Sequence, residues 1–521
     1  MASPGLSRRR FLGLAAGVGV AAAGARLTST RIALPARVRS RLGSSQPFTL
    51  GVASGDPLPD RVVLWTRLAP DPQAPGGGMP PEAVPVRWEV ARDERFAHRV
   101  AHGTARARPD DAHSVHVDVH GLEPAHEYFY RFVADGSDSP VGRTRTAPAG
   151  GANRRLRFAF ASCQDYEDGY YTAHRHLADE DVDVVLWLGD YIYESNKSTA
   201  VRPHEGPEPV DLDAYRRRYA TYKVDADLQS AHAAHPWIVT WDDHEVDNNY
   251  AADRSQRDDQ PVDAFRARRA IAYRVWWEHQ PVRLPPPDGP DYRIYRRLAF
   301  GDLANIHVLD TRQYRTNQPC GSPVDIGSPC PEQDLPDATL LGAAQRRWLF
   351  GGLRRSTARW DVLANQVMLT PVNFSPDSAN PILDFDGWDG YKIEQAEVIE
   401  ALGSLPRNGV VVTGDIHSSW ATDLVAENAP GTTPRPVATE LVGTSITSTF
   451  PLPNVLDAAV KNQPAIRYVD GHAHGYVRCE LTREALHTDF RYVAAIDTPE
   501  ATITTGASFV VEDRRPGPRP V

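Results

Sequence analysis

Five short hydrophobic runs along this chain each end in polar residues of the types that bind metals or transfer protons. The runs are apolar on both faces and rich in β-branched residues, which predicts buried strands. They cover residues 156–163, 182–194, 236–245, 360–366 and 409–417. Ligands of open α/β sheets bind beyond the carboxyl ends of the strands. We therefore predict that the polar ends of the five runs meet in one metal-rich pocket.

The groups at two of these ends favour iron. Cys163 offers a thiolate, Asp190 a carboxylate and Tyr193 a phenolate. Together on one ion, these three anionic donors are too negative for Mg²⁺ and indicate Fe³⁺. Taken alone, Cys163 could instead be a buried core thiol. Its predicted position at a strand end facing Asp190 favours the ligand role.

The remaining ends supply ligands for a second ion and a proton donor. The segment 241–249 is too polar for a structural turn, and its Asp243 is a candidate ligand, whereas Asp242 and Asp247 fit carboxylate pairing or helix capping better. His244 could donate a proton to a substrate oxygen. Further candidate ligands are Asn365, Asp415 and His417. The run 302–315 places Arg312 at one more strand end.

The first part of the chain has strand-like alternation and no helical pattern. Residues 47–147 contain six such runs at close intervals, which predicts an all-β sandwich with an immunoglobulin- or fibronectin-like core. Residues 148–155 have the composition of a linker.

The pattern changes after this linker. Strand runs now alternate with helical stretches at 169–180, 211–223, 263–280 and 343–356, and antiparallel strands follow at 475–493. This order predicts a layered α/β catalytic domain over residues 156–505. Because it is rich in Arg, Pro and Gly, the tail 506–521 is predicted to be disordered.

The composition of the chain limits the kinds of molecule that the protein could bind. The chain has 521 residues, is 41% hydrophobic and carries a net charge of −10. It therefore shows no basic surface for nucleic acid. No segment after the N-terminal leader is apolar enough to predict a stable membrane span.

Residues 1–25 have the features of an export signal. Arg8, Arg9 and Arg10 precede Phe11 and a short Gly/Ala-rich apolar stretch that ends in a small-residue cleavage site. This pattern predicts a twin-arginine signal peptide, the export machinery as a partner, and a secreted, periplasmic or cell-wall location. The alternative is an N-terminal anchor helix, but the stretch is shorter than the roughly 20 residues that span a bilayer.

Two of the four cysteines bracket a loop rich in Pro and Gly. In an exported protein, Cys320 and Cys330 are predicted to form a disulfide that fixes this loop. Cys479 lies in an alternating run and is predicted to be a small buried core residue.

The order of these motifs resembles the PhoD-type alkaline phosphatases, relatives of the calcineurin-like and purple acid metallophosphoesterases. The resemblance covers residues 48–493 and rests on ASC, GDYIYE, WDDHE, NQ and GDIH in that order. The wider superfamily has Asp-x-His where this chain has Ala161-Ser162-Cys163, and it has the neutral ligands Asn and His where this chain has Asp243 and Asp415. Carboxylates at these positions favour a hard ion that binds oxygen.

The resemblance implies a layered metallophosphoesterase-like fold that uses Fe³⁺ and Ca²⁺. Cys163, Asp190 and Tyr193 would hold Fe³⁺, and Asp190 would bridge to Ca²⁺, which would also bind Asp243, Asn365 and Asp415. His417 would be a ligand or would orient one. Arg312 would bind the phosphate, and His244 would protonate the leaving group.

The leading hypothesis is a secreted phosphatase that hydrolyses small phosphate monoesters, with diesters as further substrates, by metal-activated in-line attack at alkaline pH. One alternative is a phospholipase D-like phosphodiesterase. Another is a non-catalytic cell-surface binding protein with a structural metal centre.

Overall fold

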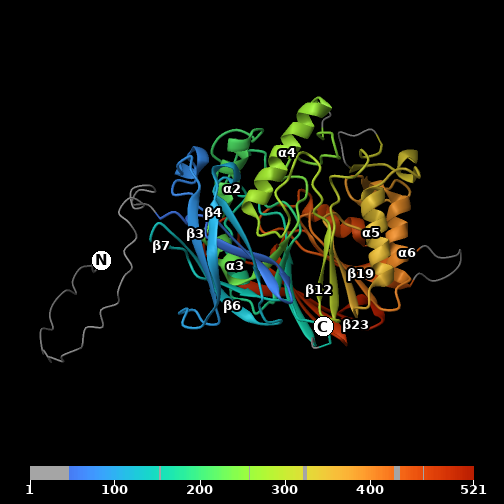
Figure 1. Cartoon of the computed structure of the whole chain (residues 1–521). Coiled ribbons are helices and arrows are strands. Elements are labelled where there is room, and N and C mark those ends of the chain that lie inside the picture. Colours follow the sequence, from blue (N-terminus) through green and yellow to red (C-terminus); the bar gives the residue numbers. More distant parts are fainter. Residues whose placement is uncertain (1–45, 152–153, 257–258, 321–325, 427–434, 462) are drawn as a thin grey trace, which may run out of the picture.

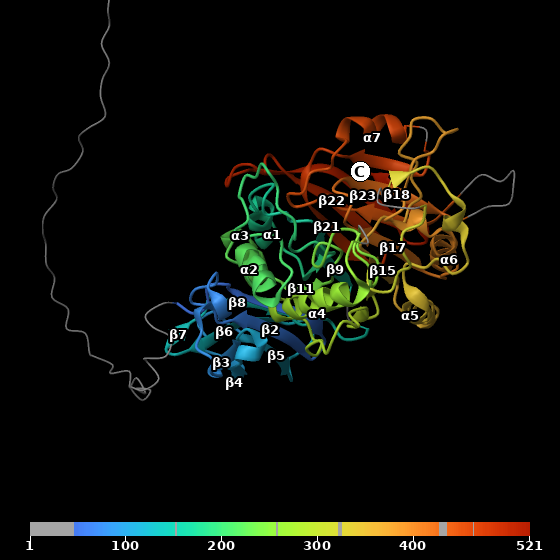
Figure 2. The same cartoon turned by 90° about the horizontal axis from the view of Figure 1, so that it is seen from above.

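Two β-sheets packed face to face form the centre of the molecule (Figures 1 and 2). The computed structural model describes residues 46–521 except 152–153, 257–258, 321–325, 427–434 and 462, so the predicted signal peptide lies outside the described residues. One sheet has the strand order β24-β23-β22-β21-β9-β10-β11-β1-β2-β5, and the other β12-β13-β15-β17-β19-β18-β20. Phe158, Phe160 and Leu186 of the first sheet share a buried cluster with Ile306 and Val410 of the second. Burial of each such side chain contributes about 1.5–3 kcal/mol.

The strands that end at the predicted site are parallel within each sheet. In the ten-stranded sheet these are β9 (Arg155–Ala161), β10 (Val184–Trp187) and β11 (Pro236–Val239). In the seven-stranded sheet they are β13 (Ala304–Val308), β15 (Trp360–Ala364), β17 (Asn408–Thr413) and β19 (Pro436–Val442). Antiparallel strands β12 (Arg296–Phe300), β18 (Ser419–Val425) and β20 (Ile466–Asp470) complete the second sheet. The five predicted buried strands are confirmed.

Helices cover the outer faces of both sheets, so the layered α/β prediction is confirmed. Next to the ten-stranded sheet lie α1 (Thr172–Ala178), α2 (Leu212–Lys223), α3 (Ala226–Ala234) and α4 (Val262–His279). Next to the other sheet lie α5 (Gly342–Arg355), α6 (Lys392–Gly403) and α7 (Pro453–Val460). Helices α1, α2, α4 and α5 correspond to the four predicted stretches. Among the helices of the described residues, none combines the length and apolar character needed to cross a bilayer.

The N-terminal region is all-β except for two short 3-10 helices, but it shares a sheet with the rest of the chain. The five-stranded sheet contains β3 (Val84–Ala91), β4 (Arg99–Ala107), β6 (Glu127–Ala134), β7 (Ser137–Asp138) and β8 (Gly142–Arg145). It packs against β1 (Val52–Leu58), β2 (Arg61–Arg67) and β5 (Ser114–His120), which extend the ten-stranded sheet. Ser54 of β1 pairs in parallel with Pro236 of β11. The sheet is therefore continuous across the predicted boundary at residue 147, and the immunoglobulin-like topology stays a prediction.

The C-terminal residues correct one expectation. Strands β21 (His474–Thr482) and β22 (Ala485–Val493) form the predicted antiparallel pair. They are followed by β23 (Ile503–Glu512) and β24 (Arg515–Pro520), so the prediction of a disordered tail at 506–521 is wrong. Phe509 and Val511 anchor β23 in the core, and the Gly517 amide donates to Thr439 Oγ1 at 2.9 Å. The prolines are tolerated because β24 is an edge strand, where a missing N–H breaks no ladder.

Both expectations about the remaining cysteines are confirmed. Cys320 and Cys330 form a disulfide, and Cys479 is buried in β21. Near the disulfide, β14 (Ile326–Gly327) and β16 (Leu383–Asp384) form a short ladder. Four 3-10 helices complete the described elements: η1 (Pro75–Gly78), η2 (Pro109–Asp111), η3 (Pro331–Asp334) and η4 (Trp388–Gly390).

Candidate metal centre

The candidate ligands follow the carboxyl ends of parallel strands and lie at one edge of the double sheet. Cys163, Asp190 and Asp243 come after β9, β10 and β11, and Asp415 comes after β17. A bridge between Ser162 and Ser445 connects the two sheets at this edge. The sheet topology therefore brings together side chains that are far apart in the sequence.

Four donor groups form what we call the sulfur-containing cluster: Cys163, Asp190, Tyr193 and His417. Asp190 Oδ2 lies 3.4 Å from the Cys163 Sγ and 3.3 Å from the Tyr193 hydroxyl. His417 Nε2 lies 3.1 Å from the same hydroxyl. Burial lowers the pKa of His417 to about 3, which keeps it in the neutral form that binds metals. The structure thus places His417 with the predicted iron ligands.

A second group, the carboxylate cluster, contains Asp190, Asp242, Asp243 and Asp415. Ligand atoms of Asp242, Asp243 and Asp415 lie within 4.8 Å of one another, and the same holds for Asp190, Asp243 and His244. Asp190 therefore belongs to both clusters. A carboxylate in this position can bind two neighbouring cations at once.

The backbone of these loops is constrained. Cys163, Asp190, Asp415 and His417 all have φ between 55° and 64°, in the left-handed region. Each such non-glycine residue costs about 1–3 kcal/mol and persists only where other contacts enforce it. A Cβ on Gly189 would lie 2.4 Å from the Cβ of Asp242, so only glycine fits there.

Glu245 is one of the contacts that enforce this backbone. Its buried carboxylate accepts hydrogen bonds from the amides of Asp190 at 3.1 Å, Tyr191 at 2.8 Å and Asp242 at 2.9 Å. A single side chain thereby fixes the loops after β10 and β11 relative to each other. Glu245 is part of the WDDHE motif, but its role was not predicted.

The side chains fit bound cations. Among the buried side-chain atoms of the described residues, Asp190 Oδ1 and Asp243 Oδ1 have no hydrogen-bond partner. Burial and the charge of Asp243 raise the pKa of Asp190 well above its usual range, and burial and the charge of Asp190 do the same for the Cys163 thiol. Cations would stabilise the charged forms of these groups. The donor set therefore fits one ion bound by sulfur, phenol and imidazole and another bound by oxygen.

His244 faces a pocket beside the carboxylate cluster. Its Nδ1 lies 2.7 Å from Glu194 Oε2. Burial alone would lower the pKa of His244, but the charges of Glu194 and Asp243 raise it well above its ordinary value. The pocket has a volume of about 290 Å³ and polar walls that include Glu194, His244 and Asn248. These charges favour the protonated form of His244, and its role as a proton donor stays a prediction.

Arg312 has a different environment from the one expected of a phosphate-binding residue. It is completely buried, and its guanidinium donates to Asp242 at 2.5 and 3.2 Å and to Asp386 at 2.9 Å. Its Nη2 also lies 3.4 Å from Asp415 Oδ1 and 3.5 Å from Asp243 Oδ1. Because these carboxylates surround its N–H groups, Arg312 supports the carboxylate cluster. The predicted phosphate-binding role of Arg312 stays a prediction.

Asn365 is buried after β15, as predicted, but its contacts differ from those of the carboxylates. Its Nδ2 donates to Val367 O and to Thr413 Oγ1, and its Oδ1 accepts from the Trp388 indole at 3.3 Å. One lone pair of Oδ1 remains for a cation. The ligand role of Asn365 stays a prediction.

Two supporting residues had no clear signal in the sequence. Ser448 donates to the Tyr193 hydroxyl at 2.7 Å, and Asp386 pairs with Arg312. Both lie in irregular segments far from the five hydrophobic runs. Glu194 does lie within a motif, but nothing in the sequence indicates its pairing with His244.

The double sheet with two adjoining ligand clusters at its carboxyl edge defines a phosphatase of the metallophosphoesterase class. A family model described as PhoD-like phosphatase matches residues 158–490, and one described as its N-terminal domain matches residues 33–148. The chain is 49% identical to alkaline phosphatase D of Bacillus subtilis (strain 168) over 490 residues, which cover 92% of this chain and 83% of that protein. The chain belongs to the PhoD-like phosphatase family.

Solved structures agree with this placement. A structure of PhoD superposes with a TM-score of 0.86 at 48% identity, covering 92% of this chain and 93% of that one. Purple acid phosphatase PPD1 from yellow lupin has a TM-score of 0.53 at 12% identity, covering 89% and 73% of the two chains, and shares the fold alone. The chain is therefore a phosphatase, and the alternative of a non-catalytic surface protein is set aside.

Proposed function

We propose that this phosphatase hydrolyses phosphate monoesters with Fe³⁺ in the sulfur-containing cluster and Ca²⁺ in the carboxylate cluster. The observation that carries the proposal is the position of Asp190, which contributes to both clusters. Cys163, Tyr193 and His417 suit iron, and Asp243, Asp415 and Asn365 suit calcium. When bound, these two metal ions would neutralise the charge of a phosphate ester and activate an attacking oxygen.

The side chains around the clusters have separate tasks. His244, held by Glu194, gives its proton to the leaving alkoxide, and the adjoining pocket receives the alcohol part of the substrate. Arg312 and Asp242 hold the carboxylates apart and in place. Glu245 and Ser448 fix the backbone of the loops and the Tyr193 hydroxyl.

Two measurements test this function. Elemental analysis of the purified enzyme should find iron and calcium, with little zinc. The rate with p-nitrophenyl phosphate should rise with pH above neutrality, require Ca²⁺, and exceed the rate with bis(p-nitrophenyl) phosphate. A preference for the diester would favour the phosphodiesterase alternative, and an active zinc-only enzyme would contradict the metal assignment.

We also infer that the protein leaves the cytoplasm by twin-arginine export, on the basis of Arg8 and Arg9 before an apolar stretch. Replacing both by Lys should keep the enzyme inside the cell, as measured by phosphatase activity in the two fractions. Replacing Arg37 and Arg39, which lie beyond the apolar stretch, is the matched control and should leave export unchanged. Normal export of the Arg8/Arg9 variant would contradict the inference.

A further inference from the structure

A short segment beside the carboxylate cluster carries several of its supporting contacts. We call residues 384–390 the clamp segment. It begins in β16, which pairs with β14, and among the described residues neither strand belongs to a larger sheet. Asp384 Oδ1 accepts the backbone amides of Asp386 at 3.0 Å and Gly387 at 3.4 Å and so closes a turn. A two-stranded ladder of this length is marginal on its own, so other contacts must hold it.

Asp386 of the clamp segment fixes Arg312. Its carboxylate accepts from Arg312 Nη1 at 2.9 Å and from Arg315 Nη1 at 2.8 Å. The Arg312 guanidinium reaches the candidate calcium ligands Asp243 and Asp415 on its other side. Asp386 therefore helps to set the position of the Arg312 guanidinium relative to the place where a cation would bind, and it neutralises part of the guanidinium charge.

A second path leads from Asp386 to Asp243. Gln318 Nε2 donates to Asp386 Oδ1 at 2.8 Å and to the carbonyl of Asn249 at 2.7 Å. The Asn249 amide in turn donates to Asp243 Oδ2 at 2.6 Å. Asp243 Oδ2 is thus linked to Asp386 through Asn249 and Gln318, while Asp243 Oδ1 lies 3.5 Å from Arg312, which itself contacts Asp386.

The same segment reaches a third candidate ligand. The indole of Trp388 donates to Asn365 Oδ1 at 3.3 Å, and the Trp388 amide donates to the Met368 carbonyl at 3.4 Å. Residues of the clamp segment therefore orient groups next to Asp243, Asp415 and Asn365, which are three of the four candidate calcium ligands.

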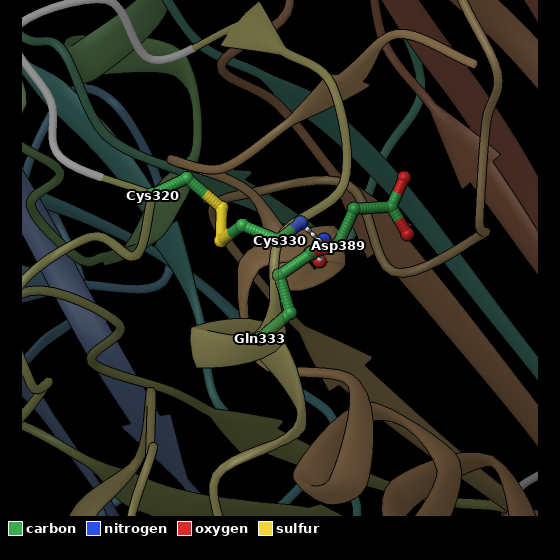
Figure 3. The surroundings of a disulfide bond; sticks show 4 residues. All are labelled: Cys320, Cys330, Gln333 and Asp389. Atoms are coloured by element: carbon green, nitrogen blue, oxygen red, sulfur yellow. Dashed lines mark hydrogen bonds between the residues drawn. A yellow bond between two sulfur atoms is a disulfide. The ribbon is translucent and has the colours of Figure 1, made fainter. Parts of the chain in front are cut away.

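The disulfide lies close to this segment, and Figure 3 shows the path from Cys330 through Gln333 to Asp389. Cys320 follows Gln318 by two residues. The Cys330 amide donates to Gln333 Oε1 at 3.0 Å, and Gln333 Nε2 donates to the Asp389 carbonyl at 2.7 Å. The bond between Cys320 and Cys330 thereby joins two segments of the chain, one with Gln318 and one with Gln333, that each contact the clamp segment. In the sequence, β14 lies between the two cysteines.

We propose that Asp386 is a positioning residue for the calcium site and that the Cys320–Cys330 disulfide holds Asp386 in place. This inference rests on the proposed calcium site. Without the negative charge of Asp386, the charge of Arg312 is less neutralised and competes more strongly with a cation at Asp243 and Asp415. Without the disulfide, the clamp segment loses a fixed position, and the same ligands become less ordered before the cation binds.

The experiment measures calcium binding directly. Equilibrium dialysis with radioactive calcium gives the Kd of the full enzyme, of Asp386→Asn and of the double variant Cys320→Ser/Cys330→Ser. We expect the Kd to rise about 10-fold in Asp386→Asn, the size of effect usual for residues that orient metal ligands, and less in the double variant. The visible absorption of the iron should stay unchanged in both. Asp377→Asn is the control, since this aspartate is exposed and its side chain accepts hydrogen bonds from its sequence neighbours Ala379 and Asn380.

Each outcome decides between the possibilities. An unchanged Kd in Asp386→Asn overturns its positioning role, and an unchanged Kd in the double variant overturns the role of the disulfide. Loss of the iron absorption together with calcium binding would show a general loss of structure and contradict a selective effect. If Asp386→Asn does not fold, the double variant, which leaves every residue of the Arg312 network in place, decides the matter. If the parent enzyme itself binds no calcium, the proposed calcium site fails, and this inference fails with it.

Discussion

The phenol ring of Tyr193 stacks on the imidazole of His244, with 4.0 Å between the ring centroids. The contact joins the two clusters, because the Tyr193 hydroxyl lies next to Asp190 and His417 while His244 follows Asp243. A bulky or charged replacement of either ring would disturb both metal sites at once. Conservative replacements are therefore the ones that separate their roles.

The first prediction concerns Tyr193→Phe. This change keeps the ring stacked on His244 but removes the phenolate, which together with a thiolate should give Fe³⁺ a visible charge-transfer absorption. We expect this absorption to bleach or shift and kcat/KM to fall about 10- to 100-fold. Tyr219→Phe is the control, because the buried Tyr219 hydroxyl has no hydrogen-bond partner among the described residues. An unchanged spectrum in Tyr193→Phe would remove Tyr193 from the iron ligands.

The second prediction concerns metal removal. Oxygen ligands on loops exchange calcium faster than thiolate and phenolate release iron. Mild chelation should therefore abolish phosphatase activity while the iron absorption remains, and added Ca²⁺ but not Zn²⁺ should restore it. Asp243→Ala should resemble the chelated enzyme. Full activity after chelation, or rescue by Zn²⁺, would count against an oxygen-ligated calcium site.

The third prediction concerns the hydrogen bonds that the Glu245 carboxylate accepts from three backbone amides. In Glu245→Gln, an amide N–H₂ must face at least one backbone N–H, so a buried donor loses its acceptor. We expect the free energy of unfolding to fall by about 2–3 kcal/mol, measured from urea unfolding of the metal-loaded enzyme. Glu400→Gln on the exposed side of α6 should change it by less than about 0.5 kcal/mol. Equal stability of the two variants would show that Glu245 does not hold the loops.

The fourth prediction concerns Lys223, which is buried where the N-terminal strands contact the catalytic part. Its ammonium lies 4.2 Å from the ring centroid of Trp65 and 5.2 Å from that of Tyr191, and among the described residues no carboxylate forms an ion pair with it. Burial lowers its pKa well below the usual value. The unfolded chain then binds more protons than the folded protein, so the contribution of Lys223 to stability rises with pH and levels off near pH 10.

Lys223→Met tests this prediction. We expect the variant to be more stable than the parent at pH 7, with a difference that shrinks toward pH 10, measured by urea unfolding across the pH range. Lys392→Met, on a partly exposed lysine, should show no such trend. A Lys223→Met variant that is less stable than the parent at pH 7 would mean that contact with the two rings outweighs the cost of burying the charge.

Much of the fold follows from local sequence pattern. The strands that end at Cys163, Asp190 and Asp415 are continuous apolar runs, and few other structures accommodate such runs in a soluble domain. Strands β4, β12, β18, β19 and β20 and helices α3, α6 and α7 are among the elements that were not predicted. The partly exposed β4 and the Ala-rich α3 have weak apolar patterns, which explains these two omissions.

Contacts between segments that are far apart in the sequence could not be predicted from a local pattern. Asp242 and Asp243 are adjacent and chemically identical, yet only the fold shows that Asp242 pairs with Arg312 while Asp243 Oδ1 stays without a hydrogen bond. The same limit applies to the tail. Its Arg, Pro and Gly content is typical of disorder, and only the neighbouring strand β23 gives it a place in the sheet.

The pairing of β1 with β11 bears on the order in which the molecule assembles during synthesis. Strand β1 leaves the ribosome long before Pro236, its partner in the ladder. Likewise, β9 is synthesised long before β21, whose Cys479 pairs with it. The large sheet therefore closes only when nearly the whole chain has been made, which is slow and leaves strand edges open in the meantime. We expect that a chain lacking β1 or β21 would not yield a smaller working enzyme, because it would leave an unpaired edge prone to aggregation.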